Sequence, residues 1–216
     1  MPRYAPVLIA AVLLAAWPAA AAGQDRSVDC VAAVVNGAAI TRFDVDVAEA
    51  VGLFNPVKGA DAAARRLAIL ELLVDQKLIL DQVQPAVPPD PAVVDTEWRR
   101  LSARIGADTL AARLARLGAA EADVRPYLEE RIRSRKIVAD RFQRTVSVSL
   151  REIEAYYADI YVKARQAEGR AAQPLVDVLD AIEAEIKKGK VETQAAAWID
   201  ALREQAEVEI RRDCLK

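Results

Sequence analysis

The sequence predicts a mainly α-helical protein in which one short strand near each end of the chain pairs with the other. Three observations support this fold class. Apolar residues recur at spacings of three and four through much of the 216-residue chain, as on one face of a helix. Proline and glycine interrupt this pattern at intervals that match ordinary helix lengths. The clearest strand-like runs are residues 31–35 and 207–211, close to the two ends.

The first strand is followed by a turn and the start of a helix. Residues 31–35 read VAAVV, and the Asn-Gly dipeptide at 36–37 is the pair best able to take the positive φ angles of a type I′ turn. Thr41 and Asp44 have the spacing of a capping box, in which each side chain accepts a hydrogen bond from the other residue's backbone amide. These signals predict a strand, a tight turn and a helix that begins at Thr41.

Caps and breakers along the chain predict eight helices. The Asp-Pro pair at 90–91 combines a capping side chain with proline at the first helical position. Asp108 is expected to cap a short helix, Ser149 and Glu152 repeat the capping box, and Gly189 is expected to end a helix. The predicted helices cover residues 41–53, 61–84, 90–106, 108–118, 123–144, 149–165, 174–189 and 192–205.

The two cysteines, Cys30 and Cys214, flank the two predicted strands. If these strands pair antiparallel, counting outward along the ladder brings position 30 beside position 214. An even number of cysteines in an exported chain favours a disulfide over the alternative of two free thiols. A zinc site is not expected, because the chain has no histidine and two thiols cannot complete a tetrahedral shell. No metal or other cofactor is predicted.

The first 23 residues resemble a cleavable export signal. Arg3 provides the positive start, residues 7–17 an apolar stretch, and Ala20–Ala22 a small-residue cleavage site. The alternative of an uncleaved anchor is less favoured, because the apolar run contains Pro18 and is shorter than the ~20 strongly apolar residues of a spanning helix. The mature protein is therefore expected in the periplasm, with no stable membrane insertion after cleavage.

The charge balance argues against nucleic acid as a partner. The chain has 30 Lys and Arg against 32 Asp and Glu, a formal net charge of −2, whereas nucleic-acid binding depends on clustered positive charge. A basic run, Arg131, Arg133, Arg135 and Lys136, is interleaved with acidic residues and is interpreted as a solvated helix face.

Five segments together resemble the SurA-like periplasmic chaperones and their relatives that carry a parvulin-type prolyl isomerase domain. They are VAAVVNGAAITRFDVD at 31–46, RLAILELLVDQKLILDQVQ at 66–84, RLARLGAAEADVRPYLEERIRSRKIVADRF at 113–142, VSLREIEAYY at 148–157 and AAWIDALREQAEVEI at 196–210. The resemblance implies a helical SurA/trigger-factor-like chaperone domain. The predicted organisation is a signal peptide at 1–23, this domain at 24–165, a linker at 166–173 and C-terminal helices and strand at 174–216 that pack back on it.

The chain departs from the family where the isomerase domain would stand. Only about sixteen residues lie between Tyr157 and Pro174, far fewer than a folded α/β domain needs. The histidines of the parvulin site are absent as well. Prolyl isomerase activity is therefore not expected. No serine has a histidine base, and no Gly-rich phosphate loop is present, so no catalytic residues are assigned.

Two classes of function remain open. The resemblance implies a chaperone that binds unfolded polypeptides or outer-membrane protein clients through an apolar helical cradle, and the alternative is an adaptor that docks one folded partner. The oligomeric state is not predicted. The candidate client-binding residues are Trp98, Leu101, Ile105, Leu110, Leu114, Leu117 and Trp198. Helices this short also need much of their apolar face for their own core, which is the alternative role for these side chains.

Overall fold

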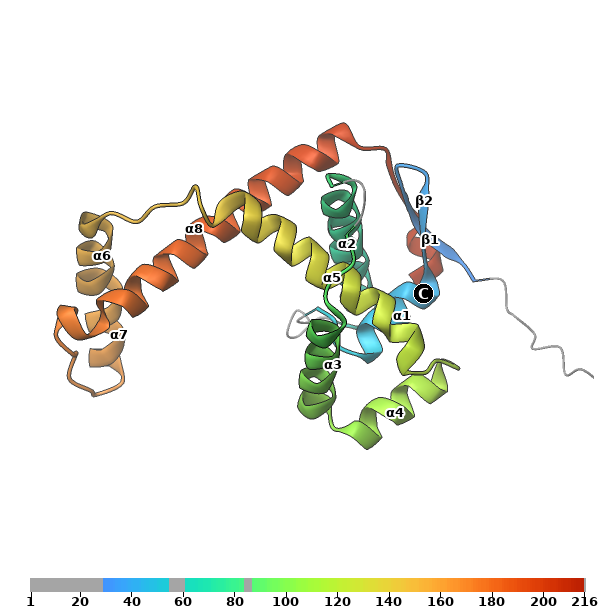
Figure 1. Cartoon of the computed structure of the whole chain (residues 1–216), viewed down its shortest axis with the longest axis horizontal. Coiled ribbons are helices and arrows are strands. Elements are labelled where there is room, and N and C mark those ends of the chain that lie inside the picture. Colours follow the sequence, from blue (N-terminus) through green and yellow to red (C-terminus); the bar gives the residue numbers. More distant parts are fainter. Residues whose placement is uncertain (1–28, 55–60, 84–86, 216) are drawn as a thin grey trace, which may run out of the picture.

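The computed structural model describes residues 29–54, 61–83 and 87–215. The predicted signal peptide lies outside these residues. The described chain is mainly helical with one small antiparallel sheet, as predicted (Figure 1). The strands are β1 (Val31–Val35), β2 (Ala38–Thr41) and β3 (Val208–Ile210), and the helices are α1 (Arg42–Ala50), α2 (Ala62–Asp81), α3 (Pro91–Ile105), α4 (Ala107–Arg116), α5 (Glu121–Phe142), α6 (Leu150–Tyr156), the π-helix η1 (Tyr157–Tyr161), α7 (Val162–Ala167), α8 (Leu175–Gln205) and the 3₁₀ turn η2 (Arg212–Leu215).

The sheet has three strands in the order β2-β1-β3, one more than predicted. Asn36 and Gly37 have φ angles of 48° and 81°, so the predicted tight turn is present and folds β2 back on β1 as a hairpin. The second strand was missed because it is only four residues long and half alanine, which gives no alternating pattern. The predicted pairing of the terminal strands is confirmed, with Ala33 opposite Ile210 and Val35 opposite Val208.

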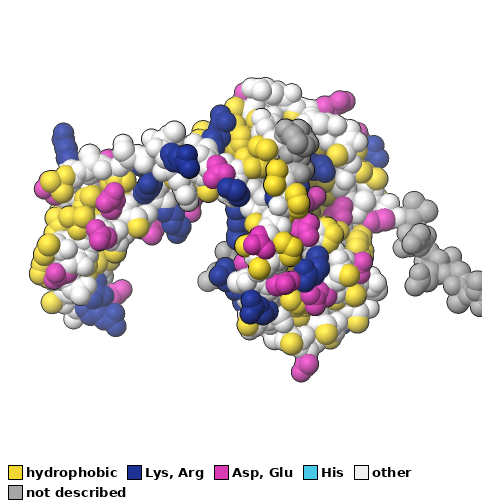
Figure 2. Space-filling view, viewed as in Figure 1, with side chains coloured by type: hydrophobic (Ala, Val, Ile, Leu, Met, Phe, Trp, Pro, Cys, Tyr) yellow, Lys and Arg dark blue, Asp and Glu magenta, His cyan; other side chains and the backbone are white. Residues whose placement is uncertain are grey.

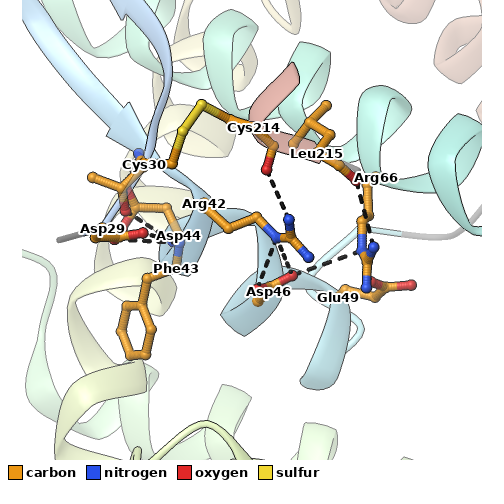
Figure 3. Close-up of polar contacts among 11 residues, drawn as sticks. Asp29, Cys30, Arg42, Phe43, Asp44, Asp46, Glu49, Arg66, Cys214 and Leu215 are labelled. Atoms are coloured by element: carbon orange, nitrogen blue, oxygen red, sulfur yellow. Dashed lines mark hydrogen bonds and ion pairs between the residues drawn. A yellow bond between two sulfur atoms is a disulfide. The ribbon is translucent and has the colours of Figure 1, made fainter. Parts of the chain in front are cut away.

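The antiparallel ladder brings the two cysteines together. Cys30 and Cys214 are at disulfide-bonding distance, with a Cα–Cα distance of 5.7 Å across 184 positions of sequence. Side chains of the first helices also hold the returning end of the chain (Figure 3). Arg42 Nη1 donates to the carbonyl oxygen of Cys214 at 2.8 Å, and Arg66 Nη1 reaches the carbonyl oxygen of Leu215 at 3.5 Å. The terminal strands are thus fixed by covalent, backbone and side-chain contacts.

Two groups of elements have separate hydrophobic cores. The first, which we call the body, comprises the sheet, α1–α5, η2 and the C-terminal half of α8. The second, which we call the arm, comprises α6, η1, α7 and the N-terminal half of α8. Its core consists of Ile153, Val178 and Ile182 with a fringe of half-buried tyrosines. The arm lies at the end of the molecule away from the sheet, and Figure 2 shows an open recess between arm and body.

The existence of the arm changes the predicted division of the chain. Residues 150–165 were assigned to the N-terminal helical domain, but their buried side chains contact the first turns of α8. Lys190 Nζ also lies 2.6 Å from Glu152 Oε1, which ties α8 to the start of α6. The expected break at Gly189 is wrong as well, because α8 runs unbroken for 31 residues. A glycine inside a helix costs about 1 kcal/mol relative to alanine, and the packing of α8 into both cores offsets that cost.

The predicted capping interactions agree with the structure better than the predicted helix ends do. The capping boxes of Thr41 with Asp44 and Ser149 with Glu152 are both present. Asp90 caps α3, with Pro91 in its first turn. Asp108 does not cap α4, however, because that helix begins one residue after Gly106 and places Asp108 within its first turn. There the carboxylate is near the positive end of the helix dipole.

The C-terminal half of α8 is fastened to α2 by one arginine. Arg203 Nη1 lies 2.6 Å from Glu71 Oε2, and its Nε lies 2.6 Å from Asp75 Oδ1. Burial raises the pKa of Asp75, and the hydrogen bond from Arg203 opposes that effect. This contact joins the C-terminal half of α8 to α2.

Candidate client-binding groove

The predicted client-binding leucines are core residues. Leu101, Leu110 and Leu114 are each no more than 5% exposed and belong to the hydrophobic core of the body. The apolar stripes of α3 and α4 are directed inward, because helices of 15 and 10 residues must bury that face to be stable. The prediction that these three leucines bind clients at the surface is therefore wrong. The remaining candidates, Trp98, Ile105, Leu117 and Trp198, are half-buried against the same core.

Of the predicted set, Trp198 borders a large apolar cavity. This cavity of about 800 Å³, which we call the groove, lies between the α2–α3 connection, the C-terminal half of α5, and α8. Hydrophobic side chains gather in this region in the space-filling view (Figure 2). The lining residues are Gln82, Val83, Val87, Pro88, Pro89, Asp90, Val93, Ile132, Arg133, Lys136, Ile137, Asp140, Arg141 and Trp198.

The sequence explains why the groove stays open at the α2–α3 connection. Pro88 and Pro89 cannot donate backbone hydrogen bonds, and a residue before proline is biased away from helical geometry. Val87 therefore lies in irregular backbone with 71% of its surface exposed. Val93, one turn into α3, is 48% exposed. These apolar side chains border the groove and are not packed into the hydrophobic core.

On the α8 side, aromatic and cationic groups fix the position of Trp198. Its ring contacts Phe142 edge-on at a centroid distance of 5.7 Å, and the Arg141 guanidinium lies 4.6 Å from the Trp198 ring centroid. Cation–π contacts of this kind orient an aromatic ring without burying it fully. The rim carries mixed charge, since Lys136 pairs with Asp140 at 2.8 Å. The groove thus combines an apolar floor with a polar, solvated edge.

Sequence reasoning missed Val83, Val87, Val93 and Ile137. The available signal was the placement of apolar residues inside a proline-rich helix break, where a solvent-exposed connection normally carries polar residues. Ile137 has no such signal, because its residue type and spacing in the sequence are those of a core residue of α5. Its role depends on the approach of a connection about 50 residues earlier in the chain.

A second cavity of about 460 Å³ lies on the sheet side of the body, between β2, α1, α2 and α5. Its main polar contact is the hydrogen bond from the Tyr127 hydroxyl to Asp44 Oδ1, at 2.6 Å. The other oxygen of Asp44 accepts from the backbone amide of Thr41 at 2.7 Å. One oxygen of this carboxylate therefore caps α1, and the other joins the start of α1 to α5. Burial and this hydrogen bond together raise the pKa of Tyr127 well above its ordinary value.

We expect Tyr127→Phe to lower the free energy of unfolding by about 1.5 kcal/mol at pH 7, because a hydrogen bond to a charged acceptor is lost. The parent protein keeps the Tyr127 proton when folded, whereas the unfolded chain releases it near pH 10. The contribution of Tyr127 is therefore complete below about pH 10 and declines as the pH rises further. Urea unfolding at pH 7, 9, 10.5 and 11 tests this. A difference between parent and variant that stays constant to pH 11 would contradict it.

The described residues hold no group of three or more His, Cys, Asp or Glu side chains placed to bind a metal ion. Within the same residues, every helix is too short or too polar to cross a membrane. Comparison of the whole chain with protein-family models and with curated proteins gave no match. The resemblance to SurA-like chaperones therefore depends on the five quoted segments alone.

Proposed function

We propose that this protein is an exported, periplasmic, chaperone-like protein that binds unfolded or outer-membrane client polypeptides without ATP and without prolyl isomerase activity. The observation that carries this proposal is the groove. Monomeric proteins rarely expose a contiguous apolar surface unless a partner uses it. The groove combines exposed valines, two prolines and a tryptophan in a cavity open to solvent.

The dimensions of the groove suit a short extended segment of polypeptide. A cavity of about 800 Å³ accommodates a few side chains and not a folded domain. Its apolar floor would bind hydrophobic side chains of many sequences, and its mixed-charge rim would leave the client backbone solvated. Such binding is weak and broad, because an unfolded client loses conformational entropy when it is ordered.

The arrangement of body and arm also supports the proposal. The five segments that resemble SurA-like chaperones include all three strands, the start of α1, most of α2, all of α5 and the last ten residues of α8. They also include α6, at the start of the arm. The resemblance implies an isomerase domain after the segment at 148–157 in relatives, whereas in this chain η1, α7 and the first half of α8 follow that segment. The recess between arm and body would leave room for the parts of a bound client that extend beyond the groove. Export is supported by the N-terminal sequence and by the paired cysteines, since disulfides persist mainly in oxidising compartments.

The test compares two variants of the mature protein in a light-scattering assay of an unfolded outer-membrane protein after dilution from denaturant. Val87→Asp with Val93→Asp introduces two carboxylates into the groove at exposed positions, so the fold is expected to remain. The control is Val176→Asp, at a position 78% exposed on the arm. We expect the parent and the control to suppress aggregation at stoichiometric amounts. The groove variant is expected to need at least tenfold more protein, from the loss of about 1.4 kcal/mol of apolar contact.

Two outcomes would contradict the chaperone proposal. Equal losses in the groove and control variants would mean that the groove does not bind clients. Failure of the parent to suppress aggregation of several clients, together with tight binding of one folded periplasmic protein, would favour an adaptor. Circular dichroism and unfolding midpoints of all three proteins establish that any loss arises from the surface and not from unfolding.

A further inference from the structure

A basic pocket outside the groove has no role in the proposed function. It is a cavity of about 210 Å³ between the end of α1, α3 and α5. The side chains on α3 are spaced three and four apart, at Glu97, Arg100, Leu101 and Arg104, which places them on one helix face. On α5, the same spacing places Leu128, Arg131 and Arg135 on one helix face. We call this cavity, completed by Gly52 and Leu53, the arginine pocket. It shares no lining residue with the groove.

The arginine pocket contains an excess of positive charge. Its four arginines face a single acidic residue, Glu97. Both oxygens of Glu97 are already engaged, one by Arg100 at 3.1 Å and the other by Arg135 at 3.4 Å. Arg104 donates to the neutral carbonyl oxygen of Gly52 at 2.6 Å. Two of the four guanidinium groups therefore have no carboxylate partner within the described residues.

Arg131 is the most informative of the four. The sequence interpretation placed it on a solvated helix face, but it is half-buried, and its guanidinium lies 4.6 Å from the centre of the Phe54 ring. Burial and the neighbouring charge of Arg135 lower the pKa of Arg131 to about 10. Among the residues that the structure describes, no carboxylate forms an ion pair with Arg131. A desolvated cation without an acidic partner is costly unless an anion is bound beside it.

The geometry suits an oxyanion with several acceptor oxygens. Guanidinium groups form paired hydrogen bonds with phosphate more readily than with a spherical anion. A volume of about 210 Å³ exceeds the roughly 30 Å³ share of one water molecule several times over, so a tetrahedral anion fits with some of its solvent. The floor of the pocket is apolar, formed by the buried Leu101 and Leu128, which excludes competing water from below.

An apolar cavity of about 570 Å³ adjoins the arginine pocket and shares Arg131 and Arg135 with it. Leu72, Ile79 and Val138 contribute to its walls. A hydrocarbon chain attached to a phosphate group would find apolar contact there. We propose that the arginine pocket binds a phosphate group, carried either by a small phosphate ester or by an amphiphile whose chain enters this second cavity.

The test uses isothermal titration calorimetry of the mature protein at constant ionic strength, with inorganic phosphate and hexyl phosphate as probes. We expect Arg131→Met to weaken binding of both probes at least tenfold. The matched control is Arg99→Gln, which removes an exposed arginine of α3 that does not line the pocket. A phosphate concentration ten times the Kd is expected to raise the Tm of parent and control by about 3–5 °C. The same phosphate should leave the Tm of Arg131→Met unchanged relative to chloride.

The unliganded Arg131→Met protein separates binding from a structural role. Methionine keeps the contact with Phe54 and removes a poorly compensated charge, so its Tm without phosphate is expected to equal or exceed that of the parent. Arg100→Gln, whose side chain is largely exposed, provides a second variant expected to weaken binding about threefold. Tighter binding of hexyl phosphate, about fourfold for each methylene buried, would support an amphiphile. Equal binding of the two probes would support a small phosphate ester.

The proposal would be overturned if neither probe bound below about 10 mM, a Kd weaker than a useful site would have. It would also be overturned if Arg99→Gln weakened binding as much as Arg131→Met, because the effect would then reflect overall charge. Neither result would alter the aggregation assay of the groove, whose variants lie on other residues.

Discussion

Loss of the disulfide is expected to destabilise the protein more than any single core truncation. For Cys214→Ser, we expect the free energy of unfolding to fall by about 5 kcal/mol, because the bond closes a loop across 184 positions of sequence. The effect acts mainly through the unfolded chain, which gains conformational freedom when the cross-link is removed. Urea unfolding of the oxidised parent and the variant, followed by circular dichroism, measures the difference.

The appropriate comparison is Cys30→Ser, which removes the same cross-link from the other end and should lower stability by the same amount. The contacts of Arg42 and Arg66 with the returning chain remain in both variants, so the folded state is expected to keep its sheet (Figure 3). Two reactive thiols in the unfolded, unreduced parent would show that the cysteines are not bonded. A loss below about 1 kcal/mol in both variants would contradict the expected size of the effect.

The second large effect concerns Leu114, which sequence analysis proposed as a client contact. Leu114 is 4% exposed and anchors α4 in the body core. We expect Leu114→Asp to lower the free energy of unfolding by more than about 4 kcal/mol, since it buries an unpaired charge in apolar surroundings. Leu114→Ala is expected to cost about 3 kcal/mol through the cavity it leaves.

Ala115→Asp serves as the control for Leu114→Asp, because residue 115 is the exposed neighbour on the same helix. Its unfolding midpoint in urea should lie close to that of the parent. A folded Leu114→Asp protein with an unchanged midpoint and reduced client binding would mean that Leu114 reaches the surface. The packing of Leu114 into the body core would then be wrong.

The sequence was most informative where a structure depends on a few neighbouring residues. The turn at Asn36–Gly37, the two capping boxes and the Asp90 cap are all local chemistry, and each is present. The pairing of β1 with β3 spans the whole chain, yet the cysteines beside the two strands made it predictable. Features of this kind carry their own signal in residue type and spacing.

Features that depend on which helices pack against each other were harder to predict from the sequence. Gly189 reads as a helix end, but the two cores on either side of it keep α8 continuous. The leucines of α3 and α4 have the periodicity of an apolar face, and periodicity alone does not say whether that face meets the core or a client. The groove joins Val87, Ile137 and Trp198 from three distant segments. Only the packing of α8 across α5 places them around one cavity.

Site-specific photo-crosslinking tests the central claim, that the groove holds unfolded clients. A photoreactive phenylalanine analogue would replace either Val87 or Val176 in the mature protein, which is then mixed with an unfolded outer-membrane protein and irradiated. Both positions are highly exposed, so they differ in location and not in accessibility. The account predicts crosslinks to several unrelated clients from position 87 and few from position 176. Equal crosslinking at both positions, or crosslinking from position 87 to one folded partner alone, would contradict it.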